Sequence, residues 1–136
     1  MGLYAEMKYN VDFLFNYAQI LSAQKKYDEA CDVLERAKLV SCNVSLWNVQ
    51  GKTYQLNAKY REAERCFKES ANLLPNRLYP YYLLAKLYVE PDFFNKDKAK
   101  QMAEIVLKKK PKVHSRAVDE MRTEMEVLLS NILQNY

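Results

Sequence analysis

The sequence predicts an all-α protein built from repeated pairs of helices. The 136 residues include only two glycines and four prolines, whereas an all-β protein needs a turn signal about every 8–12 residues. Hydrophobic residues make up 49% of the chain and charged residues 28%, which is typical of globular proteins and excludes a disordered tail or a fibre. The length suits one hydrophobic core, so we expect residues 1–136 to form a single domain.

A pattern of large and small residues recurs along the chain. Its clearest copy contains W-x3-G-x2-Y, then A-x3-F, then P, formed by Trp47, Gly51, Tyr54, Ala63, Phe67 and Pro75. This copy resembles the tetratricopeptide repeat of about 34 residues, although Gln50 replaces the leucine that usually precedes the glycine. An earlier copy contains Leu14, Ala18, Leu21, Tyr27, Ala30 and Leu34. A later copy contains Tyr81, Ala85, Tyr88, Ala99, Ala103, Val106 and Pro111.

Each copy predicts two antiparallel helices, because small residues such as Ala18, Gly51 and Ala85 let paired helices approach closely. The expected repeats cover residues 11–43, 44–77 and 78–113. The expected helices span residues 10–24, 27–40, 44–57, 60–73, 79–90 and 96–109. Tyr4 and Met7 suggest that the first helix begins earlier. The predicted architecture is a tetratricopeptide-type α-solenoid of about seven antiparallel helices.

A last helix is expected over residues 115–134, with Ser115 as its N-cap. Its apolar residues recur at spacings of three and four, at Val118, Met121, Met125, Leu128, Leu129 and Ile132. Repeat arrays need such a helix to cover their last open face. We therefore expect it to cap the three repeats.

Catalytic, metal-binding and cofactor-binding patterns are missing from the sequence. His114 is the only histidine and has no cysteine or acidic pair beside it. The two glycines are 49 residues apart, which excludes a phosphate loop or a dinucleotide fingerprint. Cys31, Cys42 and Cys66 form no CxxC pair, so we interpret them as small buried side chains. The protein is expected to be non-catalytic, without cofactor or metal.

Positive charge is concentrated near the predicted sixth helix. The net charge of +4 is too small to indicate nucleic acid, but a basic patch is formed by Lys108, Lys109, Lys110 and Lys112. Lysines at the end of a helix suit its macrodipole, and attraction to an anionic membrane surface is the alternative. The sequence has no apolar run long enough to span a membrane and no signal peptide, so we expect a soluble chain.

The first helix of each repeat should line a concave binding surface. The residues expected to face it are Asp12, Phe15, Gln19 and Ser22, then Ser45, Asn48, Lys52 and Gln55, then Tyr79, Tyr82 and Lys86. Their mixture of aromatic, amide and charged groups suits a peptide or a helix of a partner protein. The alternative is that these residues form only the solvent-exposed face of a short array.

Some tetratricopeptide proteins capture the acidic C-termini of heat-shock chaperones with lysine, arginine and asparagine clamps. The matching positions here are Phe15, Gln19, Val49, Tyr79 and Leu83. None of these side chains can clamp a pair of carboxylates. Capture of chaperone tails by that mechanism is therefore disfavoured.

A second resemblance covers about residues 44–136 and is strongest from residue 74 onward. The run from Leu74 to Tyr88 (LPNRLYPYYLLAKLY) and the run from Ala103 to Val113 (AEIVLKKKPKV) look like the C-terminal region of Bacteroidetes O-antigen ligase/polymerase-type membrane proteins. This resemblance implies a non-catalytic interaction domain on the cytoplasmic face of a bacterial inner membrane. The catalytic residues of that family lie in a membrane part that is absent here.

Two other functions stay open at this point. The chain is alternatively a free-standing cytoplasmic adaptor or scaffold that shares only the repeat. A glycan-contacting groove built on Tyr79, Tyr82, Phe15 and Asn48 is a further alternative. The partner and the oligomeric state do not follow from the sequence.

Overall fold

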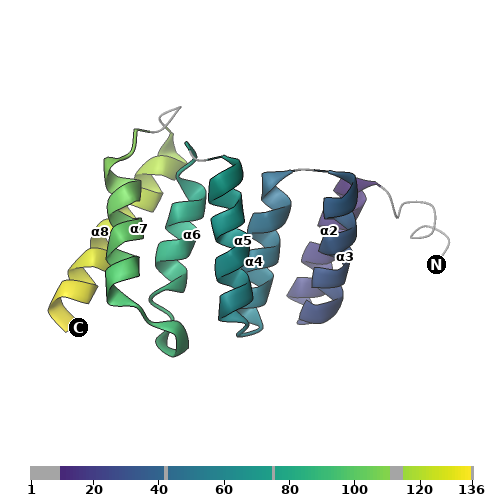
Figure 1. Ribbon diagram of the computed structural model, residues 1–136, viewed down its shortest axis with the longest axis horizontal. Coiled ribbons are helices and arrows are strands. Elements are labelled where there is room, and N and C mark those ends of the chain that lie inside the picture. The colour runs from purple at the N-terminus through teal and green to yellow at the C-terminus, as the bar shows by residue number, and fades with distance from the viewer. Residues whose placement is uncertain (1–9, 42, 75, 111–114, 136) are drawn as a thin grey trace. The chain divides into compact units, whose positions relative to one another are not determined.

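The computed structural model describes residues 10–41, 43–74, 76–110 and 115–135, and all regular elements in these ranges are helical (Figure 1). The α-helices are α2 (Val11–Ala23), α3 (Tyr27–Val40), α4 (Val44–Leu56), α5 (Tyr60–Leu73), α6 (Tyr79–Leu87), α7 (Lys96–Lys108) and α8 (Arg116–Asn135). A short 3-10 helix, η1, covers Pro91–Phe93. The predicted all-α fold is confirmed for this part of the chain. The predicted roles of Tyr4, Met7, Cys42, Pro75, Pro111, Lys112 and His114 fall outside the described residues.

The chain divides into two compact units, Met1–Cys66 and Phe67–Tyr136. Helices α2, α3 and α4 belong to the first unit, and α6, α7 and α8 belong to the second. Helix α5 contributes its first half to one unit and its second half to the other. The single domain over residues 1–136 stays a prediction.

The first two repeats have the same backbone turn between their helices. The amide of Lys26 donates to the carbonyl of Leu21 at 2.8 Å, and the amide of Lys59 donates to the carbonyl of Tyr54 at 2.8 Å. Lys25 and Ala58 precede these donors and have positive φ angles of 64° and 58°. This arrangement is the Schellman motif, in which a left-handed residue ends a helix. Because every position recurs 33 residues later, the backbone supports the repeat seen in the sequence.

Replacing Ala58 with glycine is expected to raise the free energy of unfolding by about 0.5–1 kcal/mol. The left-handed conformation costs a residue with a Cβ atom about 1–2 kcal/mol, and the greater freedom of unfolded glycine offsets part of the gain. Chemical denaturation followed by circular dichroism measures the change. Lys25→Gly serves as the matched variant in the preceding repeat, and a loss of stability in both variants would contradict this account.

Each unit has its own hydrophobic core. In the first unit, buried residues of α2, α3 and α4 form one cluster: Leu14, Ala18, Leu21, Ala30, Val33, Leu34, Ala37 and Leu46. In the second unit, α6, α7 and α8 bury Ala85, Ala103, Val106 and Met125 together. Ser115 Oγ accepts a hydrogen bond from the amide of Val118 at 3.3 Å, as expected of the N-cap of α8.

Helix α6 is shorter than predicted. We expected it to continue to residue 90, but it ends at Leu87. Glu90 is extended, with φ −61° and ψ 132°, and it precedes Pro91. The proline ring disfavours a helical conformation in the residue before it, so the chain turns through η1 before α7 begins.

Candidate functional site

The predicted binding residues of the first unit lie on two neighbouring helices. Helix α2 packs against α3 and also contacts α4, and in Figure 1 it lies behind α3. The residues concerned form a first-helix row on each of α2 and α4, defined as Asp12, Phe15, Gln19 and Ser22, and Ser45, Asn48, Lys52 and Gln55. Asp12, Gln19, Ser45 and Lys52 are exposed. Phe15 is half-buried and packs against the core cluster.

Asn48 differs from the other members of its row. Its side chain is buried, with only 9% of the residue exposed. No described group hydrogen-bonds to its Oδ1 atom, which is itself shielded from solvent. A buried acceptor without a partner costs about 1–3 kcal/mol. Asn48 is therefore a buried polar residue with an unsatisfied acceptor, whereas the other members of its row are exposed or half-buried.

The predicted residues of the second unit form a connected group with a residue of α8. The Tyr82 hydroxyl donates to Glu124 Oε2 at 2.6 Å, and Lys86 Nζ donates to the same hydroxyl at 3.3 Å. Lys86 Nζ also lies 3.8 Å from Glu124 Oε2 and 5.0 Å from the centre of the Tyr82 ring. The Tyr79 and Tyr82 rings are stacked, with centroids 5.9 Å apart. We call these four residues the tyrosine–glutamate cluster.

The environment of the cluster favours the protonated form of Tyr82. Partial burial and the carboxylate of Glu124 raise the pKa of Tyr82 above its usual value. Tyr82 thus remains a hydrogen-bond donor throughout the physiological range of pH. A phenol held in this form can position a carboxylate, but it supplies no base for catalysis.

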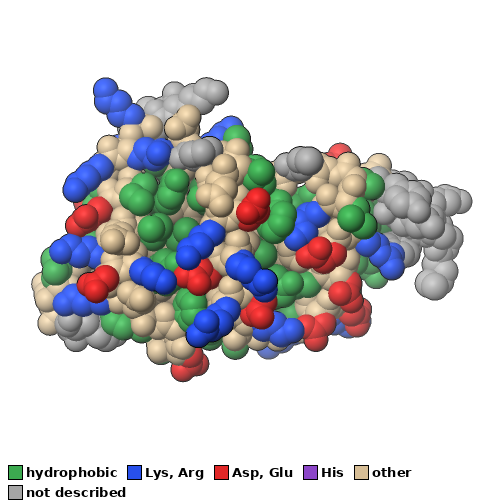
Figure 2. Space-filling model, viewed as in Figure 1, with side chains coloured by type: hydrophobic (Ala, Val, Ile, Leu, Met, Phe, Trp, Pro, Cys, Tyr) green, Lys and Arg blue, Asp and Glu red, His purple; other side chains and the backbone are tan. Residues whose placement is uncertain are grey.

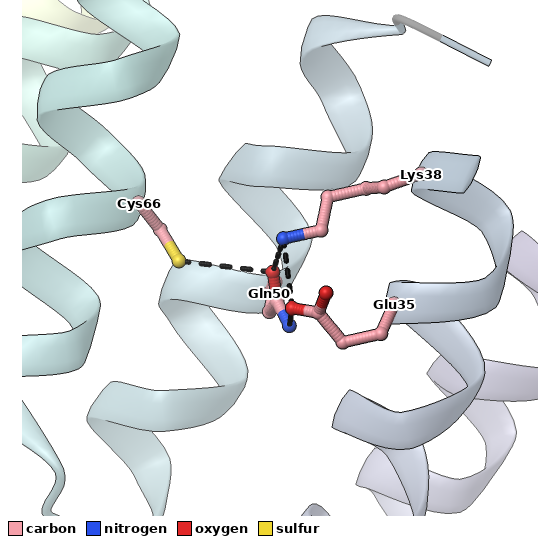
Figure 3. A network of polar contacts seen from close by, with 4 residues as sticks. All are labelled: Glu35, Lys38, Gln50 and Cys66. Atoms are coloured by element: carbon pink, nitrogen blue, oxygen red, sulfur yellow. Dashed lines mark hydrogen bonds and ion pairs between the residues drawn. The ribbon is translucent and has the colours of Figure 1, made fainter.

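A second polar network joins α3 to α4 and α5 within the first unit (Figure 3). Gln50, which replaces the consensus leucine, is completely buried. Its Oε1 accepts from Lys38 Nζ at 2.6 Å and from Cys66 Sγ at 3.8 Å, while its Nε2 donates to Glu35 Oε1 at 2.8 Å. Lys38 also pairs with Glu35 at 2.9 Å and lies 3.7 Å above the Trp47 ring.

The network fixes the contact between the first two repeats. Burial alone would raise the pKa of Glu35, but the hydrogen bonds from Lys38 and Gln50 outweigh it and lower that pKa. Glu35 therefore remains ionised, with Lys38 of the same helix and Gln50 of α4 as its hydrogen-bond partners. Because every polar atom of Gln50 has a partner, the amide is tolerated where the repeat usually has an apolar residue.

Cys31 and Cys66 are buried thiols, as expected from the sequence. Burial raises the pKa of Cys31 to about 11 and that of Cys66 to about 12. Because the thiolate is the nucleophile, both side chains are unreactive at neutral pH in the folded protein. Their arrangement gives no support to covalent catalysis.

Two lysines of the basic patch lie at the C-terminal end of α7: Lys108 is its last residue and Lys109 is its C-cap. Lys108 is exposed and lies 3.9 Å from Glu104, and Lys109 Nζ lies 5.6 Å from the centre of the Tyr81 ring. Arg122 of α8 donates to the carbonyls of Val106 at 3.3 Å and Lys109 at 2.6 Å. These positive groups complement the negative end of the helix dipole. On the face shown in Figure 2, the Lys and Arg side chains over α7 are interspersed with acidic ones.

Neither a metal site nor a membrane-spanning helix is found in the described part of the chain. Within the ranges that the structure covers, no three His, Cys, Asp or Glu side chains come together as a metal site. In those same ranges, no helix has the length and hydrophobicity needed to cross a membrane. The groups at both candidate surfaces are hydrogen-bond donors, acceptors and aromatic rings, which suit recognition of another chain.

Two parts of these sites were not predicted from the sequence. Glu124 joins the tyrosine–glutamate cluster from α8, and no spacing relates it to residues of α6. Glu35 is the second: its side chain is exposed on α3, yet it accepts a hydrogen bond from buried Gln50. The departure from the repeat consensus at Gln50 was the one available signal for that network.

Comparison with known proteins identifies similar folds. No protein-family model matches the chain, and no curated protein sequence matches it. The type III secretion chaperone SycD of Yersinia enterocolitica, in complex with a peptide of the translocator YopD, has a TM-score of 0.76 at 14% identity over 90% of this chain and 91% of that chain. PcrH from Pseudomonas aeruginosa has a TM-score of 0.74 at 12% identity, with coverage of 90% and 91%.

MamA is also similar, with a TM-score of 0.69 at 15% identity over 98% of this chain and 82% of that chain. The fold is of the tetratricopeptide type. At these identities the similarity shows the fold alone. It gives no support to the expected O-antigen ligase parent.

Proposed function

We propose that the protein is a non-catalytic tetratricopeptide-type adaptor that binds a segment of a partner protein on the first-helix faces of its repeats. The observation that carries this proposal is the pair of equivalent rows on α2 and α4. Exposed polar side chains alternate there with half-buried or buried groups, and the half-buried Phe15 offers an apolar contact. This combination suits an extended peptide or the polar side of a helix.

Asn48 adds support for a ligand on this face. Its carboxamide can both donate to and accept from a peptide backbone, and its Oδ1 has no described partner in the free protein. A small side-chain movement that lets a partner's N–H reach this atom would remove an energetic cost. Binding would then be favoured by a group that destabilises the free state.

The structural neighbours support the same class of ligand. SycD is known in complex with a peptide of YopD, and PcrH is known in complex with the chaperone binding region of PopD. Both complexes pair this fold with a segment of another protein. We propose a ligand of the same general kind here, without assigning either of those partners.

A random peptide library displayed on phage tests the proposal. We expect peptides selected on the wild-type protein to bind roughly tenfold or more weakly to Asp12→Lys/Lys52→Glu, which reverses charges within the two rows. The matched control is Asp32→Lys/Arg61→Glu, which makes the same reversals at exposed positions of α3 and α5. Failure to select any peptide, or equal losses in both variants, would contradict the proposal.

Two finer possibilities have less support. A glycan-contacting surface needs an open aromatic face, but the Tyr82 ring lies against Tyr79 and below Lys86. A parent enzyme of the O-antigen ligase type, with this domain at the cytoplasmic face of the membrane, rests on the sequence from residue 74 onward. Membrane spans encoded upstream in the same reading frame would support that parent, and their absence would exclude it.

A further inference from the structure

The tyrosine–glutamate cluster holds a carboxylate, that of Glu124, and all four of its residues belong to the second unit. Glu124 Oε2 receives the short hydrogen bond from the Tyr82 hydroxyl, 2.6 Å long, and faces the ammonium group of Lys86 at 3.8 Å. A neutral phenol and an ammonium group provide a charge-assisted binding site for one carboxylate. Lys86 in turn is positioned by the Tyr82 hydroxyl and by the face of its ring.

The carboxylate in this site comes from the chain itself. Glu124 belongs to α8, whereas both donors belong to α6, so the site is completed by a different helix. The side chains of Lys86 and Glu124 are 48% and 52% exposed, so another molecule can reach both of them. Glu120, the other acidic neighbour of Tyr82, is paired with Arg116 at 3.1 Å.

We propose that Tyr82 and Lys86 form a carboxylate-binding site that Glu124 fills in the free protein and that an acidic residue of a partner segment fills in the complex. This inference rests on the proposed function, because it concerns how the second unit recognises such a segment. The clamp residues of chaperone-tail binders are absent here, so these two donors make a different site.

Exchange of one carboxylate for another is energetically feasible. The incoming group regains the hydrogen bond from Tyr82 and the attraction of Lys86, while Glu124 rotates into water. Ion pairs between exposed side chains contribute little to stability, so releasing Glu124 has a small cost. Glu124 therefore competes with the partner's carboxylate for Tyr82 and Lys86. This competition weakens the binding of acidic segments, so that only segments that make further contacts bind well.

The test uses the phage-displayed peptide library against four proteins: wild type, Glu124→Gln, Lys86→Met and Glu126→Gln. Glutamine at position 124 keeps the shape and can still accept from Tyr82 but removes the competing charge. Glu126→Gln makes the same change of charge at another exposed position of α8. A peptide selected on Glu124→Gln is then compared with a copy in which its acidic residues are changed to amides.

We expect Glu124→Gln to select peptides richer in Asp and Glu than wild type does. The acidic peptide should bind Glu124→Gln about two- to fivefold more tightly than wild type or Glu126→Gln, while its amide copy shows no such difference. Lys86→Met should bind the acidic peptide more weakly. Tyr82→Phe, which removes only the hydroxyl, should also bind the acidic peptide more weakly. It replaces Lys86→Met in the test if that variant misfolds.

The possible failures are distinguishable. If peptides bind all these proteins with equal affinity, the carboxylate site is wrong while the proposed function stands. Preferential selection of basic peptides by wild type through Glu124 would also overturn it. If no protein selects any peptide, the proposed function fails and this inference fails with it.

Discussion

Leu34→Ala is expected to lower the free energy of unfolding by about 2–5 kcal/mol. Leu34 is completely buried in the core cluster of the first unit. Removing its side chain loses the benefit of burying those atoms and leaves a cavity, because neighbouring side chains relax only in part. Chemical denaturation followed by the helical circular dichroism signal measures the loss.

Leu39→Ala is the matched control on the same helix. Leu39 is 86% exposed, so the same substitution should change stability by no more than about 0.5 kcal/mol. Helix propensity changes equally in both variants, and the difference between them isolates burial. Similar losses of stability in the two variants would show that α3 does not pack against the core through the side that contains Leu34.

Lys38→Met is expected to lower the free energy of unfolding by about 1–3 kcal/mol. The side chain of Lys38 is only 13% exposed, and methionine retains much of its apolar contact with Trp47. Without the ammonium group, Gln50 Oε1 is left with the weak thiol donor of Cys66. The lost hydrogen bond from Lys38 to the buried Gln50 Oε1, rather than lost packing, therefore accounts for the expected decrease in stability.

A double-mutant cycle with Gln50→Leu tests that reason. The leucine restores the usual residue of the repeat and removes the acceptor that Lys38 satisfies. We expect Lys38→Met/Gln50→Leu to be less destabilised than the sum of the two single variants, by about 0.5–3 kcal/mol. Additive losses would mean that Lys38 and Gln50 contribute separately, in contradiction to the network.

Local patterns in the sequence were sufficient to predict most of the helices. These patterns are local: helix propensity and the positions of small residues such as Ala18 depend on residues within one or two helical turns. The scarcity of glycine favours helices along the whole chain. The predicted range of residues 60–73 agrees with α5, and residues 27–40 agree with α3. The end of α6 was predicted too late. The apolar residues suit a helix up to residue 90, but Pro91 disfavours a helical conformation in Glu90, and α6 ends at Leu87.

The polar contacts could not be predicted in the same way. Gln50 joins three helices, and the partner of a buried amide depends on side-chain directions that a linear pattern does not contain. Glu124 meets Tyr82 across 42 positions of sequence. Asn48 was expected at the binding surface, but its burial depends on how closely α4 packs with its neighbours. The predicted role of its row in binding stays a prediction.

The central claim is that the first-helix faces bind a partner segment. Backbone amide chemical shifts of the isotope-labelled protein, recorded by NMR while a library-selected peptide is added, test it most directly. We expect the largest shifts on α2, α4 and α6, including Gln19, Lys52 and Lys86, and small ones at exposed positions of α3 and α7. Shifts confined to α3, α5 and α7 would contradict it.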